Sequence, residues 1–164
     1  LNPSDEHYVG DMRSVRLNRV FDAVLIHDAI CHMLSESDLA ATFATAAEHL
    51  TSGGILITTP DYTTETLVSP YAFHQTRTNG DTTLTYVEYL YDPNQSDTTY
   101  DIFLTVLIEQ AGTRRVEFDH LLIGVFPKQT WVRLLNQTGF AVEFLPYVVH
   151  EDGHAGFLIV AEKL

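Results

Sequence analysis

Acidic side chains follow three of the strands that the sequence predicts, at the points where these strands end. They are Asp11, Asp28 and Asp61, each of which comes two residues after a predicted strand, over residues 6–9, 21–26 and 54–59. Ligands of open α/β sheets bind at the carboxyl ends of parallel strands. Three carboxylates there suit a cofactor that carries hydroxyl groups and an amine. The alternative is that Asp11 and Asp28 only cap the turns that follow them.

Metal and thiol chemistry are poorly supported by the residue pattern. His27, Asp28 and His32 are close in sequence, but the His-Asp pair ends a strand and lacks the further ligands that a metal site needs. His150 and His154 are four residues apart, yet the Asp-Gly pair between them indicates a loop and not a helix. We therefore predict no metal site.

The elements that would position the acids begin with a βαβ unit. The apolar run Phe21–Ile26 predicts a strand buried on both faces, and Ser37-Asp38 is typical of a helix N-cap. A helical pattern continues to Leu50, and Gly54–Thr59 predicts a second buried strand. A strand–helix–strand unit of this length is parallel and right-handed.

The rest of the chain predicts an antiparallel meander and a closing α/β segment. The meander strands are Thr82–Tyr91, Tyr100–Glu109 and Arg114–Leu122, separated by turn residues. A helix over 127–138 and strands Ala141–Leu145 and Phe157–Glu162 follow. We predict a single domain over residues 1–164 that carries a β insertion at about 63–123.

The order of these motifs resembles the second half of a class I S-adenosylmethionine (SAM)-dependent methyltransferase. The resemblance rests on Gly10-Asp11-Met12, on Asp22–His27 and on Leu50–Pro60, which match the third strand, the fourth strand and the turn into the fifth strand of that family. It implies SAM as the cofactor. It also implies that Asp11 accepts from the adenine amino group, that the Met12 backbone faces the adenine ring, and that His27 and Asp28 lie beneath the methionine part.

The downstream segments resemble the methyltransferases related to nucleotide-sugar N,N-dimethyltransferases. These segments are His120–Phe126, Trp131–Phe140 and Gly153-x-x-Gly156-Phe157. In those enzymes the antiparallel insertion covers the active site and contributes to dimerisation. The resemblance implies a small-molecule acceptor, with an amine as one option.

The same resemblance suggests which residues meet the acceptor. Pro60, Asp61, Tyr62 and Tyr71 are the candidates for lining the acceptor site. His120, which aligns with a histidine of the sugar methyltransferases, and His32 are the candidates for the catalytic base, because an imidazole titrates near neutral pH. The alternative for both histidines is a hydrogen-bonded structural role, and Tyr71 could equally be a packing residue.

The family's glycine-rich loop and the acid after its second strand have no counterpart here. The nine glycines form no G-x-G-x-x-G pattern, and the chain begins with Leu1. We therefore expect an incomplete Rossmann-like methyltransferase sheet (family strands 3 to 7) with an antiparallel insertion after strand 5. The chain would be a truncated C-terminal portion that binds cofactor poorly and is inactive alone. An exposed apolar edge at Ala23–Ile26 would then favour a homodimer, with domain swapping or a partner chain that supplies the missing half as variants.

Charge and cysteine content limit the binding partners and the cellular compartment that we expect for this protein. The formal net charge is −13, and the few basic residues form no stripe, so neither nucleic acid nor an anionic membrane surface is an expected partner. The single cysteine, Cys31, and the absence of a signal-peptide pattern suggest a reducing, cytoplasmic compartment. Cys31 has no positive neighbourhood to activate it as a nucleophile. The alternative to a methyltransferase is a non-catalytic small-molecule-binding or dimerisation module with a degenerate form of this fold.

Overall fold

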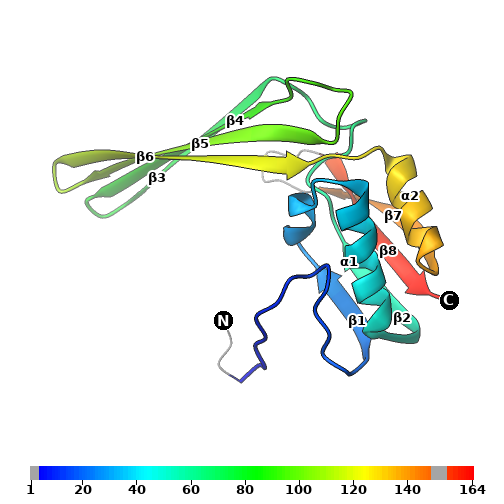
Figure 1. Ribbon diagram of the computed structural model, residues 1–164. Coiled ribbons are helices and arrows are strands. Elements are labelled where there is room, and N and C mark those ends of the chain that lie inside the picture. Colours follow the sequence, from blue (N-terminus) through cyan, green and yellow to red (C-terminus); the bar gives the residue numbers. More distant parts are fainter. Residues whose placement is uncertain (1–3, 149–154) are drawn as a thin grey trace.

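The part of the chain that the structure describes contains two four-stranded sheets and the helices that pack on the first of them (Figure 1). The structure is a computed structural model, and it describes residues 4–148 and 155–164. The first sheet has the order β1-β2-β8-β7. Its strands are β1 (Phe21–Ile26), β2 (Leu50–Thr58), β7 (Phe140–Val148) and β8 (Ala155–Lys163). The β1–β2 pair is parallel as predicted, and β8 runs antiparallel between β2 and β7.

Both helices cover the same face of the first sheet (Figure 1). They are α1 (Glu36–Glu48) and α2 (Lys128–Gln137), and each contributes a row of apolar side chains to one core. Phe43 of α1 and Trp131 of α2 are in ring contact at 5.8 Å, and both lie over Leu56 and Ile159 of the sheet. This packing is the first core.

The prediction that Phe21–Ile26 is buried on both faces is wrong. Val24 and Ile26 pack against the first core, but Leu25 is 68% exposed. No helix of the described residues lies on that second face, so alternate side chains of β1 face solvent (Figure 1). β1 is an edge strand of the described sheet, which is the position that the sequence predicted for it.

The second sheet is antiparallel and projects well beyond the first (Figure 1). Its strands, in sheet order, are β3 (Tyr71–Asn79), β4 (Thr82–Tyr91), β5 (Thr99–Gln110) and β6 (Thr113–Gly124). The three predicted meander strands are present. β3 was not predicted, because its polar residues His74–Thr78 carry no apolar alternation.

A second core fills the junction between the sheets. It comprises Cys31, Tyr62, Leu90, Tyr100, Ile102, Ile123 and Val125. The face of the antiparallel sheet that carries Tyr100 and Ile102 is the inner face, and the opposite face is the outer face. Cys31 comes from the short helix η1 (Ala29–His32), which lies beneath β6.

Gly124, at the end of β6, fixes how closely the two parts approach. A Cβ at this position would lie 1.9 Å from the carbonyl oxygen of Met33, so only glycine fits. Nearby, the Thr98 hydroxyl donates to the Leu34 carbonyl at 2.7 Å. The base of the antiparallel sheet is therefore held against the segment that follows η1.

Two local predictions are corrected by the structure. Glu6–Val9 forms no strand, because no neighbouring strand of the described residues lies beside it to supply backbone hydrogen bonds. The N-cap of α1 is Ser35 and not Ser37-Asp38: the Ser35 hydroxyl accepts from the backbone N–H of Asp38 at 3.1 Å. The predicted fold class, an incomplete Rossmann-like sheet with an antiparallel insertion, is confirmed. No helix in residues 4–148 and 155–164 is long and apolar enough to span a membrane.

Candidate active site at the strand ends

The end of β1 presents an exposed contact between a histidine and an aspartate. His27 Nδ1 lies 2.9 Å from Asp28 Oδ1, and their side chains are 59% and 74% exposed. Asp28 has a positive φ of 53° and caps η1 without a side-chain hydrogen bond. The carboxylate is therefore not occupied in capping, which was the alternative considered for it.

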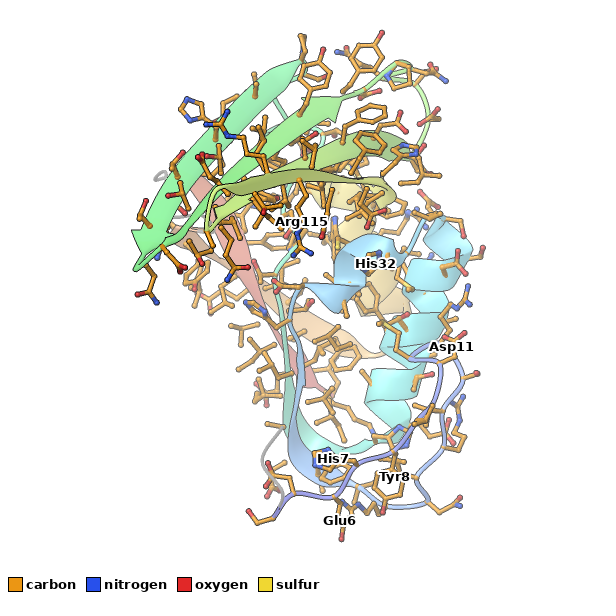
Figure 2. The ribbon with its side chains drawn as sticks, turned by 90° about the vertical axis from the view of Figure 1, so that its left-hand side faces the viewer. Glu6, His7, Tyr8, Asp11, His32 and Arg115 are labelled. Atoms are coloured by element: carbon orange, nitrogen blue, oxygen red, sulfur yellow. The ribbon has the colours of Figure 1, made fainter. Side chains whose placement is uncertain are left out.

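Asp11 belongs to a segment that runs beside α1 (Figure 2). The Arg13 guanidinium donates to its carboxylate at 2.6 Å and also contacts Asp38 at 2.7 Å. These hydrogen bonds from Arg13 lower the pKa of Asp11 to about 2. Asp11 consequently remains an ionised acceptor at neutral pH, and it also accepts from the Arg13 backbone N–H, as a turn-capping aspartate does.

Met12 borders an apolar cavity of about 180 Å³ between this segment, β1 and α1. Phe21 and Val24 of β1 and Ala46 of α1 line it as well. The N-terminal residues Glu6, His7 and Tyr8 lie at the end of the molecule away from the antiparallel sheet (Figure 2). Met12 packs against the first core, and Val15 and Leu17 of the same segment also line the cavity, whereas Asp11 is exposed.

The residues after β2 meet the inner face of the antiparallel sheet. Pro60 and Tyr62 are buried, Asp61 and Tyr71 are half-buried, and Tyr62 and Tyr71 both belong to or pack on the second core. Tyr62 contacts Tyr100 edge to face at 6.0 Å between ring centroids. The structure therefore brings the candidate acceptor-site residues together at one junction.

Cys31 is part of this junction and is not an activated thiol. Burial, followed by the negative charge of Asp61 and a hydrogen bond to it, raises the pKa of Cys31 to about 12. A thiol with such a pKa is a poor nucleophile at neutral pH.

Tyr100 is a residue at this junction that the sequence analysis missed. Its side chain is 1% exposed, and its hydroxyl has no hydrogen-bond partner among the described residues. A buried unpaired hydroxyl costs about 1–3 kcal/mol. The sequence signal for Tyr100 was only its place at the start of a predicted strand, which does not distinguish a polar role from packing.

His120 lies on the outer face of the antiparallel sheet. It pairs with Phe103, whose neighbours Ile102 and Leu104 point toward the inner face. Its ring stacks on Phe103 at 4.7 Å, and its Nε2 lies 2.6 Å from Asp101 Oδ1. The sheet therefore separates His120 from Tyr62 and Tyr100.

His32 is on η1 below the antiparallel sheet and is exposed (Figure 2). Of the two predicted catalytic histidines, His32 is the one that lies near the carboxyl end of β1, since η1 directly follows that strand. Among the described residues, no three His, Cys, Asp or Glu side chains gather as a metal site. His150 and His154 lie outside the described residues.

Comparisons with known proteins point in one direction. No family profile matches the chain. A curated relative, dTDP-3-amino-3,4,6-trideoxy-alpha-D-glucopyranose N,N-dimethyltransferase of Streptomyces venezuelae, is 26% identical over 144 residues, which is 87% of this chain and 60% of that protein. The chain thus spans less than two thirds of the length of this relative.

Solved structures give the same picture for the fold. The SAM-bound amino pentose methyltransferase CalS10 of Micromonospora echinaspora superposes with a TM-score of 0.81 at 21% identity, over 94% of this chain and 63% of that one. DesVI of Streptomyces venezuelae superposes with a TM-score of 0.83 at 24% identity, over 94% and 64%. The predicted resemblance to class I SAM-dependent methyltransferases is confirmed.

Proposed function

We propose that the chain is part of a SAM-dependent methyltransferase that transfers a methyl group to an amine of a small molecule. The observation that carries the proposal is the arrangement of the two sheets, which the chain shares over 94% of its length with CalS10 and DesVI. The curated relative, by its name, dimethylates a nucleotide-linked amino sugar. That amino sugar is the first acceptor to try.

The residues present fit one end of the cofactor. Asp11 is ionised and can accept from the adenine amino group, and Met12 offers an apolar side chain next to it. His27 and Asp28 stand at the end of β1, where the family places the methionine part. The chain contributes no glycine-rich loop to that part, since its nine glycines form no such pattern.

The chemistry asks two things of the protein. SAM, when bound, supplies an electrophilic methyl group. The protein would have to hold the acceptor nitrogen in line with that methyl group, and it would have to accept the proton that the nitrogen loses on methylation. Asp61, Tyr62 and Tyr71 would align the acceptor, and a histidine would take the proton.

We also propose a homodimer, formed through the outer face of the antiparallel sheet. Six large apolar side chains are exposed there, and we call them the outer patch: Tyr89, Tyr91, Leu107, Val116, Phe118 and Leu122. The same patch favours the second candidate function, a non-catalytic dimerisation module.

Calorimetric titration of S-adenosylhomocysteine tests the proposed function. Micromolar binding to the 164-residue chain supports a cofactor site that these residues complete by themselves or as a dimer. Binding only by a longer chain, encoded further upstream, supports an incomplete methyltransferase. If neither binds, the dimerisation module becomes the better proposal.

A variant pair makes this titration specific. Asp11→Ala removes the acceptor for the adenine amino group, and it should weaken binding roughly tenfold or more, since a hydrogen bond to a charged group is lost. Asp22→Ala removes an exposed carboxylate from β1 and should leave the affinity unchanged. Equal effects of both substitutions would contradict the assignment of Asp11.

A further inference from the structure

The Tyr100 hydroxyl is a buried polar group that the fold itself leaves unsatisfied. Three side-chain atoms share this property among the described residues: Thr58 Oγ1, Tyr100 Oη and Trp131 Nε1. Trp131 belongs to the apolar first core, and Thr58 sits in the middle of the first sheet between Ile26 and Ile159. Tyr100 differs from both because other polar groups surround it.

Four polar or ionisable side chains act on Tyr100. Burial, followed by Asp61, Cys31, Tyr62 and finally Glu88, raises the pKa of its phenol. These residues come from the end of β2, from η1 and from β4, and the Tyr100 ring lies edge to face with Tyr62. The hydroxyl therefore sits where three separate elements meet, with Asp61 as the main negative charge nearby.

Glu88 is held toward the inner face by a second tyrosine. The Tyr86 hydroxyl donates to its carboxylate, and both residues stand on β4 with their side chains on the inner face. The Tyr100 hydroxyl, which can accept a hydrogen bond, therefore lies in the field of two carboxylates from different elements, those of Asp61 and Glu88. Such a set suits a group that carries several N–H donors and a positive charge.

We propose that the Tyr100 hydroxyl and the Asp61 carboxylate hold the amino group of the acceptor. This inference rests on the proposed function and names the residues that bind the substrate. The amine donates to Tyr100 Oη and to an Asp61 oxygen, which satisfies the buried hydroxyl. The carboxylate also stabilises the positive charge that develops on the nitrogen as the methyl group arrives.

The test is an NMR titration of the 164-residue chain with D-glucosamine near neutral pH, with D-glucose as the matched probe that lacks the amine. We expect glucosamine, and not glucose, to shift amide signals around residues 31, 61 and 100. Tyr100→Phe should weaken this binding roughly ten- to hundredfold, because one hydrogen bond to a charged group is lost. Asp61→Asn should weaken it as well.

Thr58→Val is the matched control, since it removes another buried unpaired hydroxyl, at a position that lies between the apolar residues Ile26 and Ile159. It should leave glucosamine binding unchanged. Tyr100→Phe loses no hydrogen bond within the chain, so its thermal midpoint should equal or exceed that of the parent chain. This stability readout separates a loss of binding from a loss of fold.

Three results would overturn the inference: equal shifts with glucosamine and glucose, no shifts with either, or unchanged binding by Tyr100→Phe. The titration uses no cofactor, so its outcome is independent of methyl transfer. Amine binding that depends on Tyr100, together with no S-adenosylhomocysteine binding by any form of the chain, would retain the amine site and reject the methyltransferase. Binding of S-adenosylhomocysteine, together with glucosamine binding that Tyr100→Phe leaves unchanged, would retain the methyltransferase and reject the amine site.

Discussion

The two candidate histidines differ in what surrounds them. His120 stacks on Phe103 and contacts Asp101, and it lies on the outer face of the antiparallel sheet. His32 is exposed on η1, next to the buried Cys31 of the second core. Of the two, only His32 is on the same side of the sheet as Tyr62 and Tyr100, so we propose it as the proton acceptor.

A comparison of histidine variants tests this assignment. In an active form of the protein, with the amino sugar acceptor, His32→Asn should lower kcat by about 100-fold or more, which is the size of a general-base contribution. His120→Asn should lower it less, and His74→Asn, an exposed histidine of β3, should not change it. A larger loss for His120→Asn would place the reacting atoms at the outer face.

At the residue scale, three residues that were named from the sequence, Asp61, Tyr62 and Tyr71, lie at or near the junction. Asp61 and Tyr62 were named because they follow a predicted strand, whereas Tyr71 was named only through the family resemblance. Tyr100 was not found, because its significance comes from three elements that meet in space. The position of His120 could not be predicted, since a shift of one residue in strand parity moves a side chain to the other face.

Among the elements, α1 offers the clearest energetic test of a correction. Ser35 caps the helix: its hydroxyl accepts from the Asp38 N–H and donates to the Asp38 carboxylate at 2.7 Å. Ser35→Ala should destabilise the chain by about 1 kcal/mol, the usual cost of a lost N-cap. Ser37→Ala, at the residue that the sequence favoured, should cost about 0.5 kcal/mol or less, as surface changes do. Urea unfolding monitored by circular dichroism measures the free energy of unfolding of both variants. A larger loss for Ser37→Ala than for Ser35→Ala would support the N-cap that was predicted from the sequence.

The elements that were predicted share strong local signals. Apolar runs with a clear period, as in β2, β4 and β5, and the Pro127 and Gly139 boundaries of α2 were sufficient. β3 was missed because its side chains are polar and its strand identity comes from nine register pairs with β4. The strand predicted at Glu6–Val9 is absent for the opposite reason. Its residues favour an extended backbone, but a short extended segment becomes a strand only beside a partner strand.

For the whole molecule, charge decides where two copies can touch. Each chain carries a formal charge of −13, so two copies repel unless they meet at a surface with little net charge. The outer patch is such a surface: its most exposed side chain, Phe118, is 67% accessible, and the nearby Asp101 is paired with His120. Apolar patches of this kind mark interfaces.

Light scattering after gel filtration tests the interface. Phe118→Glu should convert a dimer into a monomer, because it places a carboxylate at the centre of the outer patch. Leu84→Glu, which adds the same charge at an exposed site on the inner face, should leave the dimer intact. A monomeric parent chain would contradict the dimer, and a monomer produced only by Leu25→Lys would place the contact at the β1 edge.

The close contact between Gly124 and Met33 has a consequence for how an acceptor reaches the junction. Since the base of the antiparallel sheet is clamped against the backbone after η1, the sheet cannot swing open as a rigid flap. Its far end, where the β3–β4 and β5–β6 turns project into solvent, has no such anchor (Figure 1). If the junction binds an acceptor as proposed, we expect its entry and release to depend on bending along the long strands, so that the stiffness of β5 and β6 would influence a rate.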